Sequence, residues 1–113
     1  MDWKDRVAHN ESLFREVNER IEAGHGSADR SDPAAFRCEC GSLRCNMLVE
    51  LTLSEYERVR ATSTHFFVVP GHEIPEVERV IERAATFVVV EKVGESAHVA
   101  RERDPRADAG GGD

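Results

Sequence analysis

The chain has 113 residues, of which 40% are hydrophobic and 33% are charged, a composition typical of a soluble globular protein with one domain. Its 22 acidic and 15 basic residues give a net charge of −7 and form no basic stripe, so we expect no nucleic-acid partner. No apolar stretch approaches the roughly 18 residues of a membrane span, and residues 1–11 lack the apolar region of a signal peptide, so we expect a cytoplasmic protein without membrane contact.

Residues 1–24 are predicted to form an amphipathic helix. Its apolar stripe recurs at intervals of four and three residues, the spacing of one helix face, and comprises Trp3, Val7, Asn10, Phe14, Val17 and Ile21. Two interpretations stay open. Either the helix packs on its own core, or residues 1–22 bind a protein partner or a second copy of the chain.

The rest of the chain divides by composition. Residues 25–34 contain Gly, Ser, Asp and Pro and are predicted to be a linker, which would make the helix separable from the later residues. Residues 35–100 are predicted to form a small zinc-binding α+β domain. Residues 101–113 contain no large apolar side chain and are predicted to be a disordered tail.

Within residues 35–100 the pattern alternates between strands and short helices. A helix is predicted after Ser54, which with Glu57 resembles a capping box. A second helix is predicted from Ile74, with Pro75 in its first turn. The remaining elements are strands over 35–40, 47–52, 65–71 and 86–93 and a short helix over 95–103. The predicted fold class is α+β: an N-terminal amphipathic helix, a small β-sheet and two or three short helices.

All three cysteines fall in one short segment, as Cys38, Cys40 and Cys45. An odd number of cysteines cannot form a complete set of disulfides within one chain. The residues between the second and third cysteines, Gly41 to Arg44, have turn chemistry and would fold Cys45 back toward the other two. Metal binding is therefore the preferred interpretation over buried structural thiols or a redox-active thiol, and thiolates favour zinc.

A zinc site needs a fourth ligand, which we predict to be His72. This histidine follows a strand that ends in a Pro70–Gly71 turn, where a side chain would be held close to the end of a neighbouring strand. His65 is the rival candidate, and a carboxylate such as Glu39 is a further alternative. An iron–sulfur cluster more usually takes a fourth cysteine, which the chain lacks.

Several pieces of the sequence resemble a family of small, uncharacterised bacterial proteins, mostly from GC-rich genomes. The pieces are LFREVNERIE, FRCECGSLRC, VELTLSEYERVR, FFVVPGHEIPEVERV and FVVVEKVGESAHVA, which together cover most of residues 10–100. The resemblance implies that the cysteine cluster and the segment around His72 belong to one domain, and it implies no activity.

No phosphate-binding loop, nucleophile elbow or zinc-protease motif occurs, so we expect a protein without enzymatic activity. The preferred function is a zinc-stapled protein-interaction or regulatory module with one zinc per chain. The alternatives are a nucleic-acid-associated regulator, a zinc–thiolate redox sensor, and an enzyme in which three ligands leave zinc an open position.

Overall fold

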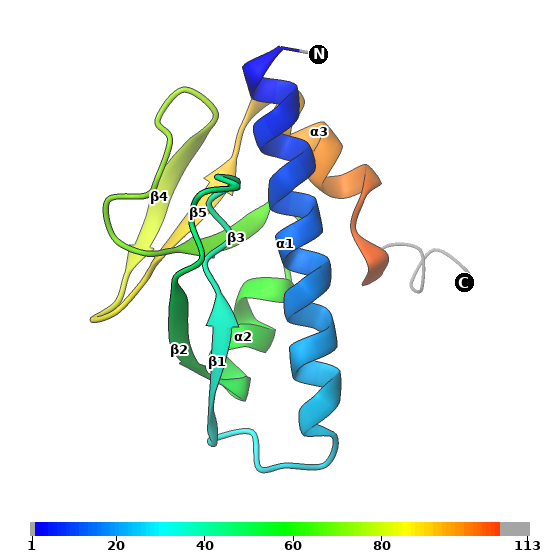
Figure 1. The fold of residues 1–113 in the computed structure, drawn as a ribbon, viewed down its shortest axis with the longest axis vertical. Coiled ribbons are helices and arrows are strands. Elements are labelled where there is room, and N and C mark those ends of the chain that lie inside the picture. The colour runs from blue at the N-terminus through cyan, green and yellow to red at the C-terminus, as the bar shows by residue number, and fades with distance from the viewer. Residues whose placement is uncertain (1, 107–113) are drawn as a thin grey trace.

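The computed structural model describes residues 2–106. Helix α1, Trp3–His25, runs along the length of the molecule (Figure 1). It begins where the Asp2 carboxylate accepts a hydrogen bond of 3.0 Å from the backbone N–H of Asp5. It ends at Gly26, whose positive φ of 55° releases the chain from the helix without a side-chain clash.

Two small antiparallel sheets make up the β structure. Strands β1, Pro33–Arg37, and β2, Leu48–Thr52, form a hairpin, and the cysteine loop joins them. The second sheet has the order β3-β5-β4, formed by His65–Val68, Val88–Lys92 and Glu78–Arg83. Helices α2, Leu53–Arg60, and α3, Gly94–Glu102, complete the fold (Figure 1). The predicted α+β class is confirmed.

The segment predicted to be a linker is tied to the first turn of α2. The carbonyls of Arg30 and Asp32 accept hydrogen bonds from the N–H groups of Ser54 and Leu53, at 2.8 and 3.0 Å. These N–H groups would otherwise lack partners at the start of the helix. The capping box is formed two residues earlier than predicted, by Thr52 and Glu55, because fully buried Leu53 already belongs to the helix.

The prediction of a helix from Ile74 is wrong. The chain makes one turn over residues 75–77 and then forms strand β4, with an irregularity between Val80 and Glu82. The cause is tertiary. β5 is an apolar central strand that is stabilised by a partner on each side, and β4 supplies the second one. Arg79 also forms a 2.6 Å ion pair across the sheet with Glu91.

An aromatic cluster joins the two sheets. Phe36 of β1 stacks on Tyr56 of α2, with ring centroids 4.4 Å apart, and both rings meet the edge of Phe67 of β3. Phe87 contacts Phe67 in the same edge-to-face way, at 6.4 Å. Such pairs add to the stability that burial of the rings already provides. The two sheets therefore share one hydrophobic core.

Helix α1 meets this core mainly through a polar face, and not through the predicted apolar stripe. Phe14 is buried, but Trp3 and Val17 of the stripe are 41% and 40% exposed. The most buried side chains include Glu11 and Arg15, which are 1% and 0% exposed. The Arg15 guanidinium donates to two backbone carbonyls, those of Ser63 and Ala100, both at 2.7 Å. The buried face of the helix is thus hydrogen-bonded to distant parts of the fold.

Residues 101–106, the described part of the predicted tail, pack against the rest of the fold. Asp104 is 2% exposed and forms an ion pair with buried Arg60. Arg106 lies against three carboxylates, those of Glu19, Glu22 and Glu57. Residues 107–113 of the predicted tail lie outside the described part of the chain. Among the helices of residues 2–106, none has the length and apolar character needed to cross a bilayer.

Candidate metal centre

The first two cysteines lie where the chain passes from one sheet to the other. The N–H of Cys38 donates to Met47 in the β1–β2 hairpin, and the N–H of Glu39 donates to Phe67 of β3, at 3.0 and 3.1 Å. Successive side chains of extended backbone point to opposite sides. Cys38 and Cys40 therefore share one side, with Glu39 on the other.

A tight turn brings the third cysteine back to the first two. The N–H of Cys45 donates to the carbonyl of Ser42 at 3.1 Å. The turn is entered through Gly41, whose φ of 78° is rarely adopted by other residues. The turn chemistry of this loop was the reason for predicting that Cys45 folds back, and the structure confirms the placement.

A second turn places His72. The N–H of His72 donates to the carbonyl of Val69 at 2.9 Å, which closes a four-residue turn with Pro70 and Gly71 at its centre. Gly71 has a φ of 95°, and proline followed by a glycine of positive φ is typical of a type II turn. His72 thereby faces the cysteines just after β3 ends.

The structure brings the four predicted residues together, and they can hold a metal ion. The sulfur atoms of Cys38, Cys40 and Cys45 and a ring nitrogen of His72 all lie within 4.8 Å of one another. The Nδ1 atom of His72 is 3.7 Å from the sulfur of Cys38 and 3.6 Å from that of Cys45. Tetrahedral zinc bonds of ordinary length would separate a nitrogen and a sulfur ligand by about 3.6 Å. The geometry fits such an ion.

The surroundings of the sulfurs favour bound thiolates. The N–H of Val69 donates to the sulfur of Cys38 at 3.2 Å. A hydrogen bond from Cys38 lowers the pKa of the Cys40 thiol to about 4, and the backbone of Ser42 adds to this effect. The same pairing with Cys40, together with burial, raises the pKa of Cys38. Because backbone groups of Val69 and Ser42 donate to the sulfurs of Cys38 and Cys40, the cluster is suited to hold thiolates around a cation.

Glu39, the carboxylate alternative, is directed away from this cluster. Its side chain is fully buried and accepts hydrogen bonds from Asn18 at 2.8 Å and from the N–H of Phe67 at 3.3 Å. Burial raises the pKa of Glu39 to about 7. His65, the rival histidine, instead contacts Glu91 at 3.2 Å.

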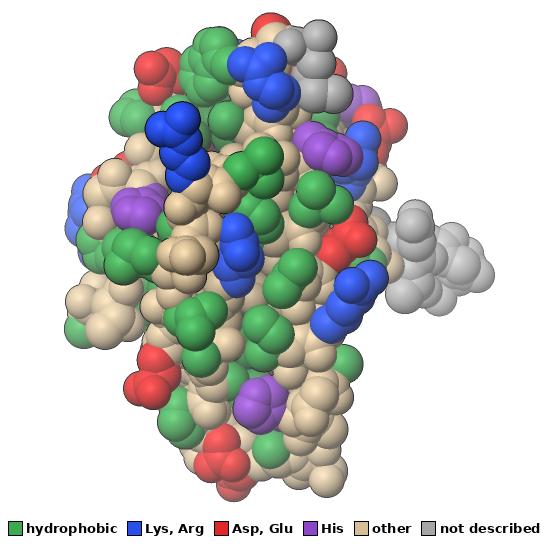
Figure 2. Space-filling model, in the orientation of Figure 1, with side chains coloured by type: hydrophobic (Ala, Val, Ile, Leu, Met, Phe, Trp, Pro, Cys, Tyr) green, Lys and Arg blue, Asp and Glu red, His purple; other side chains and the backbone are tan. Residues whose placement is uncertain are grey.

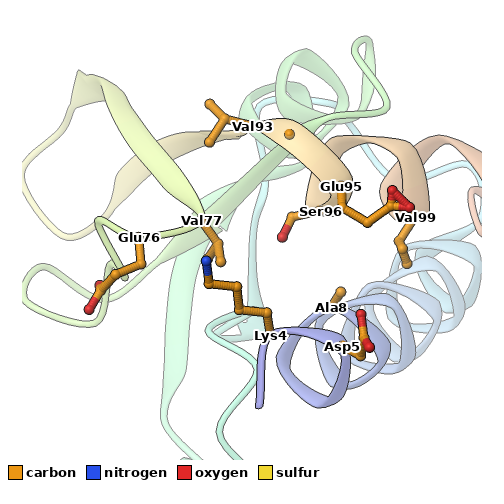
Figure 3. A pocket seen from close by; sticks show the side chains of 10 residues that line it. Lys4, Asp5, Ala8, Glu76, Val77, Val93, Glu95, Ser96 and Val99 are labelled. Atoms are coloured by element: carbon orange, nitrogen blue, oxygen red, sulfur yellow. The ribbon is translucent and has the colours of Figure 1, made fainter. Parts of the chain in front are cut away.

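A cavity of about 160 Å³ lies elsewhere, between α1, α3 and the turn before β4. Figure 3 shows the Ser96 hydroxyl directed toward its open centre and the Glu76 carboxylate directed away from it. Its charged lining residues are Lys4, Asp5, Glu76 and Glu95. None of the four clustered residues lines it, so the cavity and the metal centre are separate features.

The sequence did not identify the polar residues that surround the metal centre. Asn10 and Asn18 of α1 and Arg37 of β1 all bond to the cysteine segment. Asn10 could have drawn attention as the one polar member of the apolar stripe. Asn18 and Arg37 have no comparable signal, because charged and amide residues on a helix or strand are ordinarily exposed.

Comparison with known proteins adds no relative. No family model matches the chain, and no match is found among curated proteins or solved structures. The resemblance to small bacterial proteins therefore stays a prediction.

Proposed function

We propose that this protein is a non-enzymatic protein-interaction or regulatory module whose fold is held by one zinc ion per chain. The observation that carries the proposal is the convergence of three sulfur atoms and one imidazole nitrogen within 4.8 Å. Three thiolates and one imidazole are the donor set of a structural zinc site, and soft thiolate ligands favour zinc over magnesium, calcium or manganese.

The closed character of the cluster supports a structural role over a catalytic one. Catalytic zinc sites keep one coordination position open for water or substrate, whereas here four protein ligands would fill a tetrahedron. Cys38 and Cys40 are 0% and 4% exposed. Three thiolates also supply so much electron density that zinc becomes a weak Lewis acid.

Apolar side chains near the metal loop support an interaction role. Leu43, Met47 and Leu48 are 73%, 47% and 65% exposed, and all lie in or next to the loop between β1 and β2. On α1, Leu13 and Val17 are 41% and 40% exposed. Figure 2 shows hydrophobic side chains over this face of α1 and the hairpin. A protein partner or a second copy of the chain would cover such groups.

The three free cysteines support a reducing compartment, and we propose the cytoplasm as the location. Under reducing conditions the purified chain should contain one zinc by elemental analysis. Removal of zinc by a strong chelator should lower the melting temperature by more than about 10 °C, because metal binding contributes directly to folding free energy. Cys40→Ser should reproduce this loss. A reduced chain that holds no metal, or that melts unchanged after chelation, would refute the proposal.

A zinc–thiolate redox sensor is the second candidate. The observation in its favour is that the three sulfur atoms lie within 4.8 Å of one another, so two of them can join as a disulfide once the metal leaves. Exposure to hydrogen peroxide should then release zinc, measured with a chromogenic indicator, and thiol reductant should restore binding. Retention of zinc at peroxide concentrations that oxidise free thiols would exclude this role.

A further inference from the structure

Helix α1 contacts the metal-binding segment between its second and third cysteines. The side-chain amide of Asn10 donates to the carbonyl of Gly41 at 3.0 Å. A side chain at Gly41 would meet Val7 and Glu11, each within 2.9 Å of the Cβ position. The loop therefore lies directly on the helix surface, with no room between the two.

The helix also reaches the third cysteine through Arg37. The Arg37 guanidinium lies over the ring of Phe14, with 3.9 Å between its central carbon and the ring centroid. From that position its Nη2 donates to the carbonyl of Cys45 at 2.7 Å. Phe14 thus supports the group that holds the backbone of a metal ligand, and the stacked cation adds its own attraction.

The third contact is made at the first two cysteines. The amide of Asn18 accepts a hydrogen bond from the N–H of Arg37 and donates to its carbonyl, both at 2.8 Å. The same amide donates to Glu39 at 2.8 Å. Asn18 therefore fixes the residue before Cys38 and the residue between Cys38 and Cys40.

We infer that Asn10, Asn18 and Arg37 are positioning residues of the metal centre, and that docking of α1 and binding of the metal are coupled. This inference rests on the proposed zinc site. Asn18 of α1 bonds to Glu39, which lies between the first two cysteines, and Asn10 bonds to Gly41, which follows the second. The carbonyl of the third cysteine is bonded to Arg37, whose side chain is stacked on α1. Loss of a residue that orients a metal ligand from outside typically weakens metal binding by about 10- to 100-fold. By linkage, whatever the helix adds to metal affinity the metal returns to helix docking.

The first test measures zinc affinity by competition with a chelating dye for Asn10→Ala and Arg37→Met. Both should bind zinc about 10- to 100-fold more weakly than the unaltered chain. The matched controls are Leu13→Ala and Val17→Ala, which alter exposed side chains of the same helix and should leave affinity within about threefold. If Arg37→Met fails to fold, Asn10→Ala still decides, since Asn10 makes a single bond to the loop.

Melting of each metal-free variant separates positioning from general support of the fold. If Asn10 and Arg37 are positioning residues, their variants should bind zinc more weakly than control variants whose metal-free chains are equally stable. Cobalt, used in place of zinc, should show altered absorption bands in Asn10→Ala, because its spectrum reports ligand geometry. Unaltered zinc affinity and an unaltered cobalt spectrum in both variants would overturn the inference. Absence of zinc from the unaltered chain would instead refute the proposed function itself.

A double-variant cycle tests the route from Phe14 to Cys45. If Phe14 acts through Arg37, then Phe14→Leu should weaken zinc binding in the unaltered chain and add nothing in Arg37→Met. Additive losses in the double variant would show that Phe14 supports the fold independently and would overturn this part of the inference.

Discussion

The ammonium group of Lys92 lies 2.8 Å from a carboxylate oxygen of Glu11, and both side chains are only 1% exposed. A second carboxylate, that of Glu78, is 2.6 Å from the same ammonium group. One buried positive charge thus faces two acids. Burial, the largest influence, raises the pKa of Glu11 to about 8, so this carboxyl group carries a proton in the folded protein at neutral pH.

This relationship predicts that Glu11 makes the protein less stable as the pH rises. In the unfolded chain the carboxyl loses its proton near its ordinary pKa of 4.5, whereas in the fold it keeps the proton until about pH 8. The folded state binds the extra proton between these values. The free energy of unfolding, relative to Glu11→Gln, should therefore fall by up to about 1.4 kcal/mol per pH unit. Urea unfolding of both chains from pH 5 to about 8.5 checks this, and a constant difference would contradict it.

Substitution of Gly41 should be the most damaging glycine change. Gly41→Ala forces a Cβ atom to within 2.9 Å of the backbone oxygen of Val7, at a φ of 78° that disfavours side chains. We expect a loss of about 2 kcal/mol or more in unfolding free energy, with weakened zinc binding. Two controls separate the causes. Gly71→Ala carries only the strain of positive φ, and Gly24→Ala, in open space on α1, should be neutral or slightly stabilising. Equal effects at all three positions would refute this argument.

The two histidines near the end of β3 should differ in their effect on metal binding. His72→Ala removes the only imidazole of the cluster and should lower zinc affinity by at least about tenfold. His65→Ala removes a side chain that contacts Glu91 and should keep bound zinc at one per chain. Competition with a chelating dye measures both variants. Loss of zinc in His65→Ala with full retention in His72→Ala would show that the assignment is wrong.

Breaking the buried ion pair between Arg60 and Asp104 should lower the free energy of unfolding far more than breaking an exposed ion pair. Their nitrogen and oxygen atoms are 2.5 Å apart and their side chains are 0% and 2% exposed. Asp104→Asn leaves the Arg60 charge buried with a weakened set of partners and should cost about 3 kcal/mol. Glu82→Gln breaks an ion pair with Arg58 whose side chains are 40% and 57% exposed, and it should cost less than about 1 kcal/mol. Denaturant unfolding compares them, and equal losses would contradict this reasoning.

The metal cluster was predictable because its signals are local. Cys38, Cys40 and Cys45 lie in one loop, and Pro70 with Gly71 defines a turn directly before His72. Each of these features fixes the backbone over a few residues, and nearby sequence is enough to recognise it. The tertiary fold is needed only to bring the cysteine loop and the His72 turn together. The hydrogen bond from Glu39 of the cysteine segment to Phe67 of β3 joins the two segments.

The errors arose where distant residues decide the structure. Val77, Val80 and Ile81 have helical spacing, but they lie in or before a strand because β5 accepts β4 as its second neighbour. On α1, the apolar stripe is partly exposed because the polar face finds partners in β5 and α3. A buried acid or arginine has no periodic signature of its own, since its stability depends on which partner reaches it.

The polar face of α1 also sets the order in which the fold can be completed during synthesis. Glu11 pairs with Lys92, which is 81 residues later, and Arg15 donates to the carbonyl of Ala100, 85 residues later. Glu19 meets Arg106 only after 87 more residues. Helix α1 is synthesised well before these partners, so this part of its docking comes late, and until then its acids and Arg15 stay in water. Contacts of such long sequence separation slow folding, and this topology makes the closing step one that joins the two ends of the described chain.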